Sequence, residues 1–185
     1  TLFRSTTKIM LEELFANTPK LERIIKIFGE KITVKFLLSK PNEDLSSKVK
    51  SIYEKLATLE KLITEKFITP DDIVVICNSA VSSFTENLEY FVNNIEVFKS
   101  LKALGFTIQH LVTPANATHT IKENVEYIKN SIRPLEKLVK DNDGCEMEYI
   151  IDVLLAPSTT TSSREKIAYL LKTPTLKSFN GKTVK

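Results

Sequence analysis

The chain has 185 residues, a formal net charge of +3 and 42% hydrophobic residues, which is enough apolar content for a buried core. No run approaches the roughly 18 apolar residues that a membrane-spanning helix needs, so we expect no transmembrane segment. Two cysteines, Cys77 and Cys145, are too few for a disulfide framework and favour a reducing compartment, cytoplasmic or nuclear. The four glycines do not form a phosphate-binding loop, and so low a count disfavours an all-β fold with many turns.

The first forty residues contain two predicted short helices and one ambiguous segment. Residues 6–15 have a helical pattern, and Thr18-Pro19 predicts the start of a second helix that runs toward Phe28. Residues 31–38 alternate between apolar and polar positions, as a strand does, but a single strand would need a partner. Residues 31–38 are therefore expected to form either a helix or an extended segment.

The clearest helix is predicted over residues 42–67. Its apolar residues follow spacings of 4, 3, 4, 3 and 4, which is typical of a helix packed lengthwise in a bundle or coiled coil. These residues are Leu45, Val49, Ile52, Leu56, Leu59 and Ile63. Charged residues of both signs occupy the positions between them, so the opposite face is expected to contact solvent.

A second long helix is predicted over residues 70–104. Residues 72–77 form an apolar run that could also be a buried strand. The preceding Thr69-Pro70 has the pattern of a helix N-cap followed by proline at the first helical position. Because apolar residues continue at spacings of 3 and 4 beyond this run, one helix ending near Gly105 explains the whole segment.

A third long helix is predicted after Thr113-Pro114. The apolar residues between 121 and 139 repeat the spacings of 4, 3, 4, 3 and 4. Pro134 lies inside this pattern and should kink the helix or divide it near Asn130, because proline removes a backbone donor.

The rest of the chain predicts turns and short helices. Residues 141–144 have the composition of a turn, a short helix is expected at residues 147–154, and Ser163 could cap a last helix that ends near Lys172. The predicted fold class is all-α, an elongated antiparallel helical bundle with three long heptad-patterned helices and shorter flanking helices. No internal repeat is visible beyond the heptads.

The expected domain organisation is one bundle domain over residues 1–172, followed by a basic C-terminal tail over residues 173–185. Neither part has a recognisable catalytic constellation. The only histidines are His110 and His119, and together with the two cysteines they lack the short ligand spacing of a metal site. We expect surface histidines, a core role for Cys77, no metal, no cofactor and no enzyme activity.

Charge is distributed unevenly along the chain. Residues 1–40 carry eight basic and four acidic side chains, residues 141–155 carry five acidic and no basic ones, and residues 156–185 carry six basic and one acidic. The candidate partner-binding residues are the basic side chains Arg23, Lys26, Lys31, Lys35, Lys177, Lys182 and Lys185. Thr173, which precedes a proline in the basic tail, is a candidate phosphorylation site.

These features predict a non-catalytic scaffold or adaptor domain that binds other proteins in a larger intracellular assembly, such as a cytoskeletal, chromosome-segregation or trafficking complex. The alternative is a helical nucleic-acid-binding module that uses the basic N-terminal region and tail. The chain has no tryptophan, no interleaved aromatic pattern and no docking motif, which disfavours that alternative. A subunit whose chemistry lies in another part of a longer chain is a third possibility. The partner and the oligomeric state do not follow from the sequence.

Overall fold

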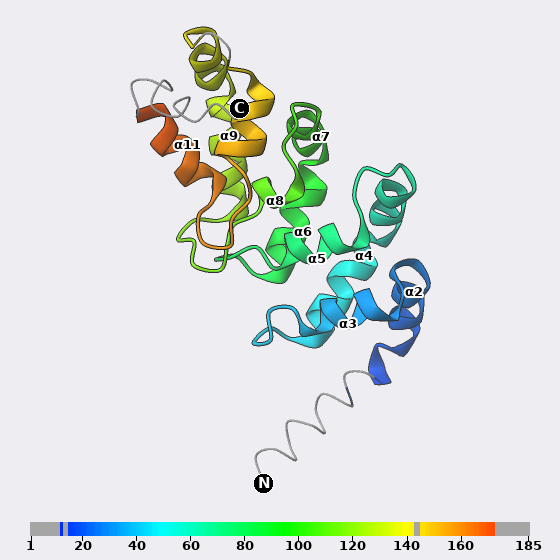
Figure 1. The fold of residues 1–185 in the computed structure, drawn as a ribbon. Helices are drawn as coiled ribbons and strands as arrows, with labels where there is room; N and C mark the ends of the chain where they lie inside the picture. Colours follow the sequence, from blue (N-terminus) through cyan, green and yellow to red (C-terminus); the bar gives the residue numbers. More distant parts are fainter. Residues whose placement is uncertain (1–11, 13–14, 143–144, 173–185) are drawn as a thin grey trace. The chain divides into compact units, whose positions relative to one another are not determined.

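In the computed structural model, which describes residues 12, 15–142 and 145–172, every regular element is helical (Figure 1). The predicted all-α class is therefore confirmed for this part of the chain. The elements are α2 (Thr18–Phe28), α3 (Glu30–Leu38), α4 (Leu45–Thr64), α5 (Pro70–Cys77), α6 (Phe84–Asn93), α7 (Ile95–Ala103), α8 (Ile108–Leu111), α9 (Ile121–Lys140), α10 (Met147–Tyr149), the π-helix η1 (Ile150–Leu154) and α11 (Ser163–Lys172). The antiparallel bundle arrangement and the extent of the domain stay predictions, and the helix expected at residues 6–15 lies almost wholly outside the described residues.

The chain divides into two compact units, Thr1–Glu96 (unit 1) and Val97–Lys185 (unit 2). In unit 1, α2 packs against α3 and α4, α3 packs against α5, and α4 packs against α6. Phe36 lies at the centre of this core, with its ring edge-to-face to Phe28 at 5.3 Å and to Phe84 at 6.3 Å between centroids. In unit 2, α9 contacts α8, α10 and α11.

The N-terminal half of unit 1 agrees with the sequence prediction and resolves the ambiguous segment. Helix α2 begins at Thr18, and α4 begins after Asp44, whose carboxylate accepts the Ser47 backbone N–H at 2.7 Å. Residues 31–38 belong to the helix α3, so the extended alternative is wrong. Helix α3 begins directly after Gly29, whose φ of +81° suits glycine and separates α3 from α2.

The prediction of one helix over residues 70–104 is wrong, because this segment forms α5, α6 and α7. The predicted start is correct: Thr69 and Asp72 exchange side-chain-to-backbone hydrogen bonds of 2.8 and 3.2 Å. The first break comes from a second capping box, in which Ser83 and Glu86 make the same exchange and begin α6 anew. The apolar spacing continues across the break because α5 and α6 pack on each other.

Helix α9 also begins later than predicted. The segment after Thr113-Pro114 is not helical, and the cap is Thr120, whose side chain accepts the backbone N–H of Glu123 at 3.2 Å. Pro134 does not divide the helix, which continues to Lys140. Pro134 lies on the exposed face, where water can solvate the carbonyl that has lost its donor.

The C-terminal elements lie close to their predicted positions. The short helix over residues 147–154 is present, and its second half is the π-helix η1. The cap of α11 is Ser162, one residue before the predicted cap Ser163. Its backbone N–H donates to Glu165 at 2.8 Å, and its hydroxyl accepts the Glu165 N–H at 3.3 Å.

One arrangement recurs at the start of four helices, α4, α6, α9 and α11. In each, the N-cap side chain accepts the backbone N–H of the third helical residue. The side-chain nitrogen of the fourth helical residue donates hydrogen bonds to carbonyl oxygens at or just after the end of the preceding short helix. These fourth residues are Lys48, Asn87, Asn124 and Lys166.

Because the last carbonyls of a helix have no partner within it, each of these side chains satisfies groups that would otherwise be buried and unpaired. Lys48 Nζ donates to the carbonyls of Leu37 at 3.0 Å and Ser39 at 2.7 Å. Asn87 Nδ2 donates to those of Cys77 at 3.2 Å and Ser79 at 2.8 Å. The interaction fixes the loop between the two helices of each pair.

The four helix pairs form a repeat along the chain. The short helices begin after Gly29, Thr69, Thr107 and Glu146, at intervals of 40, 38 and 39 residues. Such intervals are typical of helical-repeat proteins. This recurrence lies in the helix starts and their hydrogen bonds, so it does not appear as a repeat of residues in the sequence. The shared feature is a hydrogen-bond donor at one position, and it is lysine in two copies and asparagine in the other two.

Candidate partner-binding surface

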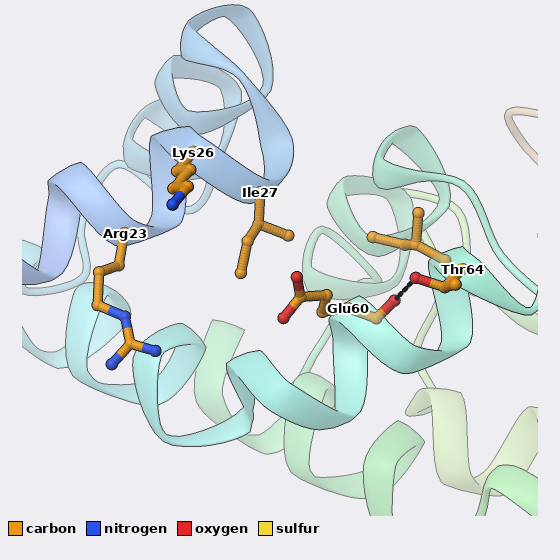
Figure 2. Close-up of a pocket in the computed structure, with 6 residues that line it drawn as sticks. Arg23, Lys26, Ile27, Glu60 and Thr64 are labelled. Carbon is orange, nitrogen blue, oxygen red and sulfur yellow. Dashed lines mark hydrogen bonds between the residues drawn. The ribbon is translucent and has the colours of Figure 1, made fainter.

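A pocket of about 360 Å³ lies between α2 and the C-terminal half of α4 in unit 1 (Figure 2). Its lining combines two basic side chains, one acidic side chain, two isoleucines and a threonine. These are Arg23, Lys26, Ile27, Glu60, Ile63 and Thr64. Two of the predicted partner-binding residues thus line one concave site together with residues that follow them by more than thirty positions.

The periodicity of α2 explains which side chains face the pocket. Ile24 and Phe28 are buried, with 1% and 6% of their surface exposed, and hold α2 against the core. Arg23 and Lys26 are exposed, and Ile27 points from α2 toward α4 (Figure 2).

The Arg23 side chain is positioned by Tyr53 of α4. An Nη1–H of Arg23 donates to Tyr53 Oη at 3.1 Å, and its guanidinium carbon lies 5.5 Å from the centre of the Tyr53 ring. A guanidinium held in this way keeps donors for a carboxylate while losing less conformational entropy on binding. Arg23 is therefore a preorganised cationic group at the edge of the pocket.

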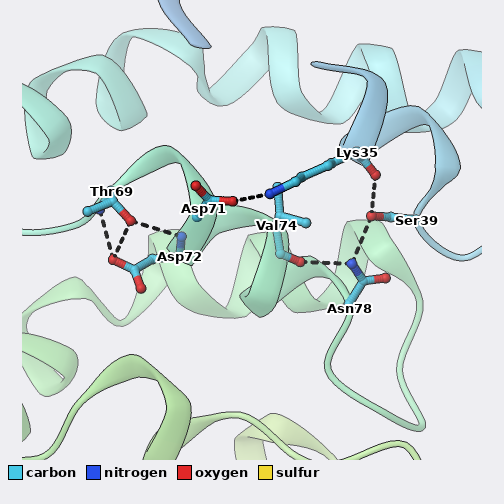
Figure 3. A network of polar contacts seen from close by, with 7 residues as sticks. All are labelled: Lys35, Ser39, Thr69, Asp71, Asp72, Val74 and Asn78. Atoms are coloured by element: carbon cyan, nitrogen blue, oxygen red, sulfur yellow. Dashed lines mark hydrogen bonds and ion pairs between the residues drawn. The ribbon is translucent and has the colours of Figure 1, made fainter. Parts of the chain in front are cut away.

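The other two predicted N-terminal residues, Lys31 and Lys35, lie on α3 and do not line the pocket. Lys35 forms an ion pair with Asp71 at the start of α5 (Figure 3). In the same network Ser39 donates to the Lys35 carbonyl at 2.7 Å and accepts from Asn78 Nδ2 at 2.8 Å. Lys35 therefore joins α3 to α5.

The predicted residues of the tail lie outside the described residues. These are Lys177, Lys182, Lys185 and the candidate phosphorylation site Thr173. The structure therefore brings Arg23 and Lys26 together, assigns Lys35 to an ion pair within unit 1, and leaves Lys31 exposed on α3.

Both histidines are buried, so the expectation that they lie on the surface is wrong. His110 is 2% exposed and His119 is 6% exposed. The Nδ1 atom of His110 accepts the Thr107 backbone N–H at 3.0 Å, and its Nε2–H donates to the Ile151 carbonyl at 3.3 Å. This places the neutral imidazole of His110 between α8 and η1. Burial lowers the pKa of both histidines, and Arg164 lowers that of His119 further.

The buried histidines predict a loss of stability at mildly acidic pH. Because their pKa values are lowered, both imidazoles bind protons less readily in the folded chain than in the unfolded chain, which takes up protons as the pH falls through the ordinary value of 6.5. The free energy of unfolding should therefore decrease between pH 7.5 and pH 5.5, which is above the range in which the capping carboxylates titrate. Thermal unfolding should show a melting temperature lower by a few degrees at pH 5.5. His119→Gln should reduce this difference, and an equal difference in the variant would contradict the assignment.

Of the two free cysteines, Cys77 lies in the core of unit 1 and Cys145 is half-buried in unit 2. Cys77 is fully buried, as predicted, and burial raises the pKa of its thiol. Among the described residues no group of three histidine, cysteine, aspartate or glutamate side chains is placed to hold a metal ion. No described helix is long and apolar enough to cross a bilayer.

Comparison of the chain with protein-family models, curated proteins and solved structures finds no match. The function is therefore inferred from two features of the molecule, the pocket between α2 and α4 and the repeated helix pairs.

Proposed function

We propose that the chain is a non-catalytic protein-binding module, a scaffold or adaptor within a larger assembly. In this proposal the pocket between α2 and α4 holds a short partner segment that carries an aliphatic side chain next to an acidic one. The observation that carries the proposal is the combination of two isoleucines with a preorganised arginine in one pocket. A volume of about 360 Å³ suits one or two side chains of a partner.

The lining assigns a role to each part of such a segment. Ile27 and Ile63 supply an apolar surface that an aliphatic side chain can bury. Arg23 and Lys26 supply positive charge, and a guanidinium can bind a carboxylate through two hydrogen bonds. Glu60 lies in the same pocket and would repel a ligand that is acidic throughout, so it favours a segment with a single acidic position.

The repeated helix pairs support the same class of function. Proteins built from recurring helix pairs commonly bind other proteins through the surfaces of those pairs. The acidic Glu60 beside Arg23 and Lys26 is unfavourable for a phosphate backbone, which counts against the nucleic-acid alternative at this pocket.

The test is affinity capture from cell extract, with and without nuclease, comparing the wild-type chain with Arg23→Glu/Lys26→Glu. Both side chains are exposed, so the double variant should keep its helical content by circular dichroism. The matched control is Arg133→Glu/Lys137→Glu, which reverses an exposed arginine and lysine on α9. We expect a nuclease-resistant protein partner that the pocket variant loses at least tenfold and the control retains. Capture that depends on nucleic acid, or that the pocket variant retains in full, would contradict the proposal.

A further inference from the structure

The pocket between α2 and α4 has two poles of opposite charge. Arg23 and Lys26 place positive charge on the α2 side, and Glu60 places a carboxylate on the α4 side. All three side chains are exposed. Ile27 extends from α2 toward Glu60, so an apolar surface lies between the poles (Figure 2). The lining is therefore polarised rather than uniformly basic.

The chain does not neutralise these charges itself. Within the residues that the structure describes, neither Glu60 nor Lys26 forms an ion pair. Thr64 donates its hydroxyl to the Glu60 carbonyl oxygen at 2.9 Å, not to the carboxylate. Arg23 donates to Tyr53 Oη at 3.1 Å, and Tyr53 precedes Glu60 on α4 by about 10 Å along the helix axis. The guanidinium and the carboxylate are therefore held apart, and each keeps its capacity to bind an opposite charge.

A ligand that fills the pocket covers Glu60 as well as the two basic side chains. Removing water from a carboxylate costs free energy unless a cation or a hydrogen-bond donor replaces that water. An acidic side chain bound at Arg23 leaves this cost in place, because it brings no positive charge to Glu60. Complementary charges across an interface also select the correct partner and its register. The ligand that satisfies both poles carries an anion and a cation, with an aliphatic group between them.

We propose that the partner segment is extended and carries an acidic, an aliphatic and a basic residue at alternate positions. Alternate residues of an extended chain lie on one face about 7 Å apart, so the flexible charged side chains can reach both poles. The acidic side chain binds Arg23 and Lys26, and the basic side chain binds Glu60. The aliphatic side chain lies between Ile27 and Ile63. This inference rests on the function proposed above and adds the basic residue and the spacing.

The test measures binding of fluorescent nine-residue peptides to the full chain at physiological salt. The first peptide has glutamate, leucine and lysine at alternate positions in a serine host and is made in both orders. In the second peptide glutamine replaces the lysine, and in the third glutamate replaces it. We expect the first peptide, in its better order, to bind at least fivefold more tightly than the second and at least tenfold more tightly than the third. Glu60→Lys should reverse the preference, so that the third peptide binds at least fivefold more tightly than the first.

Glu54→Lys is the matched control, since Glu54 is an exposed glutamate of the same helix that does not line the pocket. This variant should keep the wild-type order of affinities, and both variants should keep their helical content by circular dichroism. Equal binding of the first and second peptides, or a wild-type order of affinities in Glu60→Lys, would overturn the basic residue without contradicting the function proposed above. No binding of any peptide would contradict that function and this inference together, so the two failures are distinguishable.

Discussion

Replacing Asn124 by alanine is expected to lower the free energy of unfolding by about 3 kcal/mol, because several buried polar groups lose their partners together. The side chain is fully buried in unit 2. Its Nδ2 group donates to the carbonyls of His110 at 3.1 Å and Leu111 at 2.8 Å, and its Oδ1 accepts the Arg164 backbone N–H at 3.0 Å. One amide thus joins the end of α8 to the start of α11.

Urea unfolding followed by circular dichroism measures this loss, and hydrogen exchange of the α8, α9 and α11 amides locates it. Asn130→Ala is the matched control, since Asn130 is exposed on the same helix and its replacement should change stability by less than about 0.5 kcal/mol. Asn124→Asp should be at least as damaging as Asn124→Ala, because a carboxylate cannot donate to carbonyl oxygens. Equal stability of the Asn124 and Asn130 variants would show that the amide does not hold the helices.

Lys48→Met is expected to cost about 2–3 kcal/mol in unit 1, since methionine keeps the apolar stem but removes every donor. Lys48 is 2% exposed, and its ammonium donates to the carbonyls of Leu37, Ser39 and Lys40 at 3.0, 2.7 and 3.3 Å. Burial lowers the pKa of Lys48, while the carboxylates of Glu43 and Asp44 act in the opposite direction. Without the ammonium group, the carbonyls that follow α3 would remain desolvated and unpaired.

The control for this prediction is Lys50→Met on the same helix. Lys50 is exposed and lies 3.8 Å from Glu54 in an i,i+4 pair, so its loss should cost less than about 0.5 kcal/mol. Lys48→Gln should be less destabilising than Lys48→Met, because an amide serves the same purpose in α6 and α9. Chemical unfolding of the three variants checks the order, and a glutamine variant as unstable as the methionine variant would contradict it.

Local signals made much of the helical structure predictable. Three features could be recognised from residues close together in the sequence. They are the cap at Thr69, the start of α2 at Thr18 and the apolar stripe of α4. The prediction of one long helix over residues 70–104 was wrong because the apolar spacing continues across a break between two helices when both pack on the same core. A readable signal was present, since Ser83 and Glu86 have the spacing of a capping box.

The site was less predictable because its contacts are not local. Arg23 and Lys26 could be selected from the charge of the N-terminal region, but the packing that brings Glu60 and Ile63 beside them joins distant parts of the chain. The same holds for His110, whose burial depends on Ile151, forty-one residues later. Nothing in the residues adjacent to that histidine indicates an interior position.

The recurring donor at the fourth position of α4, α6, α9 and α11 also bears on how such a chain can change during evolution. An ammonium on a long stem and an amide on a short one both reach the carbonyls after the preceding helix, so selection can preserve the contact while the residue varies. The residue at this position can therefore differ from one helix pair to the next while the donor still binds the carbonyls of the loop. The helix pairs share the spacing between a helix cap and the donor that follows it, whichever residue supplies that donor.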